Sequence, residues 1–424
     1  MRDPLEQRAR PTGEPDETEP SEKGQEAQPA RVRAVIGLGL LVLLAVLTVA
    51  YPWTMAIVAG VVALIMAHEA GHLIAAKRSG MLATEFFVGF GPRIWSFQRG
   101  ETEYGVKAIP AGGYVRIVGM NNLEEVDPAD EPRTYRQGRS RDRLVVVLAG
   151  VTINVLIAIA LLFGVYATRG VPGGLSTTLS EVLAGSPAAE AGIEAGDRIL
   201  SIGGAQIDEW DDVSESLEER AGETIAVVIE RDGVQREVRV APRPRTAGSD
   251  DGFLGIGPSE AIDDLSVLEA GGETVRTIRD GTTGFVDALA NFFSPAGISD
   301  QSERVTGGSG GGGSGGGGGG DGPVGIIGIV DVGGDIVDGD LWRLLELLAA
   351  INLVIGLFNL VPLLPFDGGH AAIVVYEAVA SRVRGRRVQA NIQKLMPITA
   401  VVVTVLLMFA VSVAIVDLRR AIGS

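Results

Sequence analysis

From Ala34 to Ala67 the chain carries no charged side chain. A helix that crosses a bilayer needs about 20 predominantly apolar residues, so this run is too long for one straight span and short for two. Tyr51-Pro52-Trp53 lies near its middle, and proline ends helices while aromatic rings favour the bilayer surface. The pattern favours two spans, 34–51 and 54–76, over a single kinked helix. It is typical of a polytopic α-helical membrane protein.

Three later apolar runs predict the remaining spans: Leu144–Thr168, about Leu344–Pro365 and about Leu395–Val416. Segment 34–53 is then an extra N-terminal helix beside four core spans. Residues 1–33 are rich in Pro, Glu, Gln and Arg and have too few large apolar side chains to form a core. We expect this tail to be disordered, and we read no secretory signal in it.

The charges are distributed unevenly along the chain. Segment 169–343 holds 31 acidic and 12 basic residues, whereas arginines gather in the loops 77–143 and 382–394. The positive-inside rule therefore places both basic loops and the N-terminus in the cytoplasm, and 169–343 outside. The net charge of −17 argues against a nucleic-acid partner, and the absence of cysteine excludes disulfides and thiolate metal sites.

The outer segment divides into two parts. Residues 172–245 alternate short strand-like runs with turns, which predicts a folded domain that contains several strands. Residues 246–343 read as a linker that contains an amphipathic helix within 265–293 and a nearly pure glycine stretch at 307–320. This domain and linker separate two halves of a membrane core, 54–168 and 344–424.

One motif inside the second predicted span carries chemistry. His68-Glu69-Ala70-Gly71-His72 has the HExxH spacing, which puts both histidines on one helix face, where they can bind one metal ion beside Glu69. Chance is the alternative explanation, because short motifs recur. It is disfavoured because ionisable residues inside a span are costly and are usually functional. The motif predicts a zinc site with Glu69 as the base that accepts a proton from water.

Catalytic zinc commonly takes three protein ligands, so a third is expected at a similar depth. The segment Asn359-Leu-Val-Pro-Leu-Leu-Pro-Phe-Asp367-Gly-Gly-His370 supplies the carboxylate at the inner end of a predicted span. Its prolines break the helix and its glycines permit close approach of the backbone. Asp367 is the predicted ligand, against the alternative of a helix-end residue that faces water. His370 is a weaker ligand candidate and is ranked as a supporting or substrate-contacting group.

The HEAGH run and the Asn-x-x-Pro-x-x-x-Phe-Asp-Gly run resemble the site-2 protease family of intramembrane metalloproteases. The family has Leu where Phe366 stands, and proline is usual where Val151 stands. Span 34–51 is not part of the family's usual four-span layout. The similarity covers about residues 54–416 and is nearest to the bacterial branch with an extracytoplasmic PDZ domain. Further similar pieces are Phe87–Pro92, Gly112–Val115, Ala149-Gly150 with Asn154, and Gly322–Ile326.

The resemblance implies one Zn²⁺ per chain, held by His68, His72 and Asp367, with Glu69 as general base. It also implies that Asn359 helps to hold an extended substrate backbone. From the residues alone, the amides of Asn359 and Asn154 could equally form contacts between helices, and for Asn154 that role is favoured.

Residues 104–118 read as two strands around a Pro-Ala-Gly-Gly turn, on the cytoplasmic side. A strand edge can hold an extended peptide through main-chain hydrogen bonds, so Gly112, Gly113 and Tyr114 are substrate-binding candidates. An ordinary hairpin is the alternative. The family has a membrane-associated β-hairpin here, which favours the substrate role.

Residues 186–200 resemble the PDZ segment Pro-Ala-x-x-Ala-Gly-[x3]-Gly-Asp-x-Ile, and this resemblance implies that 172–245 form an inserted α+β PDZ domain. PDZ domains receive peptides beside a strand edge, but a domain in this position could instead act as a steric filter.

The resemblance implies a zinc endopeptidase in the bacterial cytoplasmic membrane, with its active site near the cytoplasmic side. It would cleave single-span membrane proteins in regulated intramembrane proteolysis. Anti-sigma factors already cut by an extracytoplasmic protease are the expected substrates. A rival reading is a non-enzymatic, zinc-dependent scaffold or chaperone that presents peptides through its PDZ domain. A metal transporter is disfavoured, because the polar groups form one site and no path across the bilayer.

Overall fold

A computed structural model describes residues 30–121, 124–218, 220–244, 251–292, 294, 337 and 339–423. Most of the predicted disordered tail, the glycine-rich stretch at 307–320 and the family-like piece Gly322–Ile326 lie outside the described residues.

The first two predicted spans are separate helices, α1 (Ala30–Ala50) and α2 (Pro52–Arg78). Tyr51 between them departs from helical geometry, with φ −137° and ψ 66°, and Pro52 occupies the first turn of α2. Proline suits this place because the first helical N–H has no partner within the helix. Two helices were predicted here in preference to a single kinked one, and the break falls at the predicted residues.

The later spans correspond to α3 (Ser140–Arg169), α9 (Leu341–Asn359) and α11 (Met396–Gly423). Among the described residues, α2, α3 and α9 are long and apolar enough to cross a membrane. Helix α9 ends six residues before the predicted boundary at Pro365. An irregular segment then leads into α10 (Asp367–Arg384), a helix that was not predicted.

The hairpin was predicted with the wrong turn. Strand β1 (Ala83–Arg99) pairs with β2 (Thr102–Ile117) around Gly100, whose φ is +64°. Residues 110–112 are only a bend in β2. On either side of this bend, 103–106 and 113–116 both pair with the same part of β1, 85–88. The two predicted strands therefore flank β1 and do not pair with each other. The Pro-Ala-Gly-Gly sequence is typical of a turn, but pairing of both segments with β1 decided the register.

A second sheet forms the domain that follows α3. Its strand order is β10-β3-β4-β6-β7, with β5 beside β4, and β8 and β9 pair separately. Its core is built from residues of 179–254 alone, including Leu179, Ile199 and Val227. The sheet includes β10, beyond the predicted limit at 245. The elements are β3 (Val171–Val182), α4 (Pro187–Glu190), β4 (Arg198–Ile202), β5 (Ala205–Gln206), α5 (Trp210–Glu215), β6 (Ile225–Arg231), β7 (Val234–Val240), β8 (Arg243–Pro244), β9 (Gly252–Phe253) and β10 (Ile256–Asp263).

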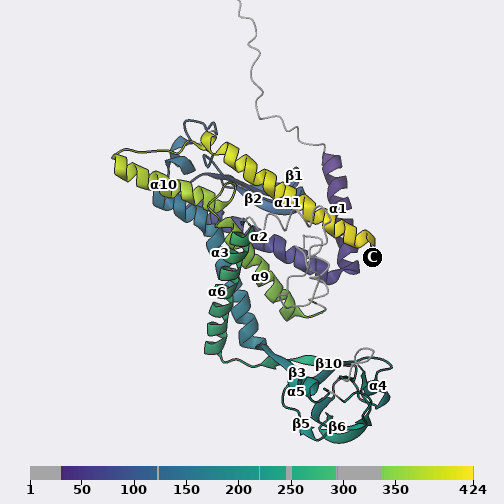
Figure 1. Ribbon diagram of the computed structural model, residues 1–424. Helices are drawn as coiled ribbons and strands as arrows, with labels where there is room; N and C mark the ends of the chain where they lie inside the picture. Colours follow the sequence, from purple (N-terminus) through teal and green to yellow (C-terminus); the bar gives the residue numbers. More distant parts are fainter. Residues whose placement is uncertain are drawn as a thin grey trace, which may run out of the picture.

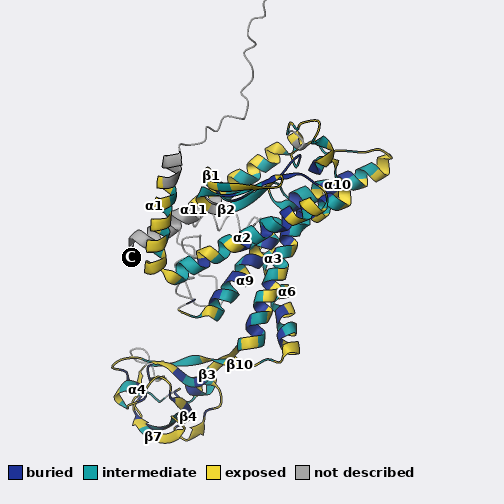
Figure 2. Ribbon diagram, turned by 180° about the vertical axis from the view of Figure 1, so that it is seen from behind, coloured by how far each residue is buried: buried dark blue, intermediate teal, exposed yellow. Residues whose placement is uncertain are grey.

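The two sheets lie at opposite ends of the helical part (Figures 1 and 2). Helix α3 runs directly into β3, and β10 leads into α6 (Val267–Phe292), the predicted amphipathic helix. Helix α6 packs beside α3 and α9, where Ile278 contacts the cluster of Leu162, Val165 and Ala349. The β3–β10 domain is thus attached to the core through α3 and α6.

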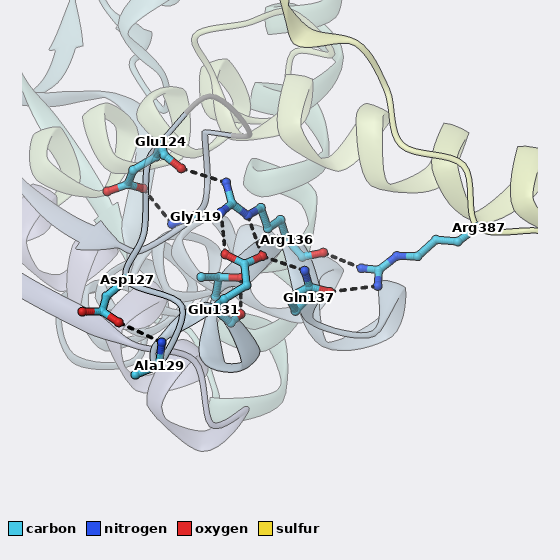
Figure 3. A network of polar contacts seen from close by, with 9 residues as sticks. Gly119, Glu124, Asp127, Ala129, Glu131, Arg136, Gln137 and Arg387 are labelled. Carbon is cyan, nitrogen blue, oxygen red and sulfur yellow. Dashed lines mark hydrogen bonds and ion pairs between the residues drawn. The ribbon is translucent and has the colours of Figure 1, made fainter. Parts of the chain in front are cut away.

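The loop after β2 is held by a network of ion pairs (Figure 3). The Arg136 guanidinium binds the Glu131 carboxylate and donates to the Glu124 carbonyl, 2.9 Å away. Arg387, which follows α10, donates to the Arg136 carbonyl and to Gln137. The network fixes this loop against the chain that follows α10.

Candidate metal centre

Helix α2 brings His68, Glu69 and His72 together, because the positions i and i+4 lie one turn apart on the same face. Both imidazoles are 5% exposed, and their Nε2 atoms are 3.1 Å apart. The His72 Nδ1–H donates to the Val146 carbonyl of α3 over 2.7 Å. This bond fixes the ring and directs its Nε2 atom toward His68.

Asp367 is the first residue of α10 and reaches the histidines from the far end of the sequence. Its Oδ2 atom is 3.1 Å from the Nε2 atoms of both His68 and His72. A Cβ on Gly368 would lie 2.2 Å from the Leu360 carbonyl oxygen, and one on Gly369 would lie 2.5 Å from the backbone N of Leu364. Glycine at both positions therefore lets the irregular segment fold tightly against the start of α10 and hold Asp367 in place.

The three ligand atoms fit a zinc ion. Zinc binds imidazole nitrogen and carboxylate oxygen at 2.0–2.2 Å, and tetrahedral bonds of that length separate two ligand atoms by about 3.3 Å. The three separations in this cluster are each 3.1 Å. In the described part of the chain this is the one group of three metal-ligating side chains that converges in this way. Two nitrogens and one oxygen leave a fourth tetrahedral position open, as in catalytic zinc sites.

Helix α3 packs directly against the two histidines, and this contact requires glycine at position 150. A Cβ on Gly150 would lie 2.5 Å from His72 Nε2 and 2.6 Å from His68 Nε2. On α2, a Cβ on Gly71 would lie 2.9 Å from the Ala149 carbonyl oxygen. The Ala149-Gly150 piece noted in the sequence thus marks the place where two helix backbones approach closely.

Glu69 is held by the sheet. Its Oε2 atom accepts a hydrogen bond from the backbone N–H of Val115 in β2, 3.0 Å away. Gly113, two residues earlier, passes so near α2 that a Cβ would lie 2.3 Å from Met66 Sδ. Residues 113–116 of β2 therefore lie directly beside α2, the helix that carries the HExxH motif.

The structure places the other candidate residues in different ways. Tyr114 donates to Glu85 and accepts from Lys107 Nζ at 2.7 Å, so its hydroxyl is engaged within the sheet. Gly112 sits in the bend with φ +109°. His370 lies on α10 outside the metal-ligating group, and Asn359 ends α9 half-buried.

Asn154 is fully buried in α3 and does take part in a contact between helices, through its backbone. Its carbonyl accepts a hydrogen bond from Asn352 Nδ2 of α9 over 2.6 Å. A Cβ on Gly356 would lie 3.1 Å from the Asn154 Cβ, so the two helices are close here. Asn352 was missed in the sequence, although an amide within an apolar run was a usable signal.

A buried ion pair was also missed. Arg143 Nη1 of α3 lies 2.6 Å from Glu377 Oε2 of α10, and both residues are almost fully buried. The Arg143 guanidinium lies 4.8 Å from the Tyr135 ring centre, and Glu377 Oε1 accepts from the Ala390 amide. This pair ties the helix that carries Asp367 to α3. Arg143 was read only as part of the basic loop, and nothing in the sequence links it to Glu377, which lies 234 residues away.

Comparison with known proteins agrees with the zinc-type ligand set. Residues 56–306 and 320–403 match peptidase family M50. The chain belongs to this family, the site-2 proteases. It is 32% identical over 395 residues to the zinc metalloprotease Rip1 of Mycobacterium tuberculosis, covering 84% of this chain and 94% of that protein. The zinc metalloprotease Rip1 of Mycolicibacterium smegmatis is 31% identical over 376 residues, covering 80% and 90%.

Among solved structures, the PDZ domain of the SdrC-like protein from Listeria monocytogenes matches 20% of this chain and 86% of that domain. Its identity is 19% and its TM-score 0.18, so it carries no argument here. The M50 membership identifies the protein as a zinc metalloendopeptidase of a membrane protease family, as the sequence predicted. Helix α1 precedes the matched residues.

Proposed function

We propose that this M50 protease is a zinc-dependent intramembrane endopeptidase that cleaves single-span membrane proteins. The observation that carries the proposal is the convergence of His68, His72 and Asp367 beside Glu69 on a helix long and apolar enough to span a bilayer. One zinc ion per chain would be held by these three side chains.

The residues of the chain divide the chemical work. Zinc, when bound, lowers the pKa of its water to about 7 and polarises the carbonyl to be cleaved. Glu69 accepts the proton of the attacking water and delivers it to the leaving amine. The Val115 amide orients the Glu69 carboxylate, and the Val146 carbonyl orients His72. Burial of both histidines keeps bulk water away from the ligands.

A substrate strand would lie beside residues 113–116 of β2. Peptides bind at strand edges through main-chain hydrogen bonds. Residues 113–116 are paired to β1 on one side only and adjoin Glu69 on the other. Gly113 lets this strand lie close against α2, Gly112 remains a candidate for contact with the substrate backbone, and Tyr114 stiffens the sheet through Glu85 and Lys107. Asn359 and His370 remain candidates for contacts with the substrate.

The orientation follows from charge. The basic loops and the β1–β2 sheet would be cytoplasmic, and the acidic β3–β10 domain, a PDZ-type domain, extracytoplasmic. The location of the two sheets at opposite ends of the helices supports this orientation (Figure 1). A single-span protein already shortened outside, such as an anti-sigma factor, is the substrate class that we propose. An extracytoplasmic protease would act before this enzyme.

The enzymatic proposal is tested with the full-length protein, a single-span substrate and two variants. We expect Glu69→Gln to retain about one zinc per chain and to lose cleavage by at least about a hundredfold, because only the base is removed. We expect His72→Ala to lose zinc as well. Cleavage by Glu69→Gln at the wild-type rate would instead point to a scaffold or to another base. Full zinc retention by His72→Ala would refute the ligand assignment.

The orientation is tested separately in the cysteine-free background. Ser140 and Ser214 are both exposed, so each accepts a cysteine with little change in volume. A membrane-impermeant thiol reagent added to intact cells should label Ser214→Cys and spare Ser140→Cys. The reverse pattern would overturn the orientation.

A further inference from the structure

A groove of about 640 Å³ lies between α10 and the start of α11, and its lining does not include His68, His72 or Asp367. Gly369, Ala372, Ile373 and Tyr376 form its α10 wall, a stripe at helical spacing. Residues Val374 and Glu377 lie on another stripe of α10 and are buried in the core and against Arg143. The groove therefore opens on the side of α10 that faces away from α3.

The lining of the groove has an apolar part and a polar, basic part. Its apolar lining comes from Leu363 and Leu364 before α10, from Ile373 of α10, and from Leu395 and Ile398 just before α11 and at its start. Its polar and basic lining comes from Arg384 at the end of α10 and from Gln389, Asn391 and Lys394 in the segment that leads to α11. No acidic side chain lines it within the described residues. A lining of this kind suits an amphiphile with an anionic head and an apolar tail.

The two cations of the groove are available to a ligand. Arg384 and Lys394 are exposed, and their side chains form no hydrogen bond or ion pair within the part of the chain that the structure describes. Arg387, three residues after Arg384, differs because it is bound to Arg136 and Gln137 (Figure 3). No acidic residue occurs between Glu377 and Asp417 to compensate these charges. No acidic side chain of the groove lining or of this stretch of sequence therefore balances the charges of Arg384 and Lys394.

We propose that this groove binds an anionic phospholipid, with the headgroup at the basic lining that Arg384 and Lys394 supply and an acyl chain along Ile373, Leu395 and Ile398. Basic pockets between membrane helices are sites that anionic headgroups prefer. A bound acyl chain would fill the gap between α10 and α11 and cover apolar side chains on both helices. The site is independent of the proposed cleavage reaction, because it needs neither zinc nor Glu69.

The test uses the purified full-length protein in detergent and native mass spectrometry with phosphatidylglycerol. We compare the double variant Arg384→Gln/Lys394→Gln with the control Arg382→Gln/Arg386→Gln. The control removes the same charge from two exposed arginines of the same segment that do not line the groove. We expect phosphatidylglycerol binding to weaken about thirtyfold in the groove variant and less than about threefold in the control. Equal weakening in both variants would overturn the site, because surface charge alone would then explain binding.

Two further measurements separate the lipid from simpler ligands. Phosphatidylcholine with the same acyl chains should bind at least about tenfold more weakly than phosphatidylglycerol, since its head is neutral overall. Inorganic phosphate should not displace the lipid, and displacement would show a phosphate site without a tail site. Ile373→Trp keeps both cations and fills the groove, so it should also release the lipid. Unchanged lipid binding in Ile373→Trp, with zinc content intact, would refute the acyl-chain path.

Discussion

Gly150 shows how strongly one residue can constrain the metal centre. A methyl group at this position would overlap the ligand nitrogens of His68 and His72, and the helix backbone cannot yield without moving α3. We expect Gly150→Ala to weaken zinc binding by about 10–100-fold, the range seen when groups that support metal ligands are altered. Zinc affinity of the purified protein, measured with a competing chelator, checks this.

Gly164 provides the matched control for that substitution. It lies on the same helix, and a Cβ there would meet nothing within 4 Å. Gly164→Ala should leave zinc affinity unchanged and favour the helix slightly. Equal zinc affinity in Gly150→Ala and Gly164→Ala would contradict the close packing beneath the histidines.

Val115 tests whether the sheet positions the base. Val115→Pro removes the N–H that binds Glu69, and proline is tolerated where a strand edge does not use that N–H for pairing. Val115→Ala keeps the N–H and serves as the control. We expect kcat to fall by about tenfold in Val115→Pro alone, the loss of about one charge-assisted hydrogen bond, with zinc content unchanged. A similar kcat in both variants would show that Glu69 is oriented by other groups.

At the scale of elements, the Arg143–Glu377 pair holds α10 against α3. Removal of one partner leaves the other charge buried, which typically costs about 3–5 kcal/mol. Glu377→Gln should therefore lower the thermal unfolding temperature clearly and loosen the helix that carries Asp367. The exposed pair of Arg133 and Glu101 is the control, because such pairs contribute about 0–1 kcal/mol, and Glu101→Gln should change little. Equal destabilisation by both variants would refute the structural role of the buried pair.

The β3–β10 domain has its own ion pair with a pH signature. Burial raises the pKa of Asp197, but hydrogen bonds from Arg231 and the Glu194 amide outweigh burial and lower it below its usual value of 3.8. A lowered folded-state pKa gives stability that is present above the unfolded pKa and is lost as pH falls through the folded one. Since its core is self-contained, the isolated domain 171–263 should lose stability below about pH 4.

Asp197→Asn separates this effect from the general effect of acid on the domain. The variant should be less stable than the parent domain at pH 7 and should show a smaller loss between pH 4 and pH 2. Chemical denaturation at a series of pH values measures both. Identical pH profiles would show that other carboxylates dominate.

For the whole molecule, the attachment of the β3–β10 domain through α3 and α6 suggests a steric role. A substrate with a folded ectodomain would collide with this domain, and its acidic surface repels an anionic peptide terminus. We expect a deletion of 171–263 that joins α3 to α6 to permit cleavage of an untrimmed substrate and to preserve cleavage of a trimmed one. The limits follow the sheet, because deletion at 245 would leave β10 without its partner β3.

Cleavage assays on the paired substrates decide between the filter and peptide capture. Glu69→Gln in the deletion background controls for contaminating proteases. If a well-folded deletion variant retained zinc and lost cleavage of the trimmed substrate, the domain would have to bind the substrate.

Much of this protein was accessible from local pattern. The uncharged run with a central proline predicted the break between α1 and α2, and helical spacing put both histidines on one face of α2. These are relations between residues within a few positions, which backbone geometry fixes wherever the segment lies. Asp367 was predicted from the need for a third ligand and from the irregular segment around it, and the resemblance to the site-2 proteases agreed. The comparisons confirm that family. The predicted hairpin turn was wrong, because both segments of β2 pair with the same part of β1, one on each side, and that pairing exists only in the folded sheet.

Tertiary structure alone decided which distant groups complete the centre. Gly150 beneath the histidines, the Val115 amide on Glu69 and the Arg143–Glu377 pair each join different elements. Val115 lies 46 residues from Glu69, and Glu377 lies 234 residues from Arg143, so no periodicity in the sequence links these partners. Sequence determined what each segment is, because propensity and burial pattern act locally. Packing determined which residues of different segments meet at the metal centre, because a contact between elements depends on how their backbones approach one another.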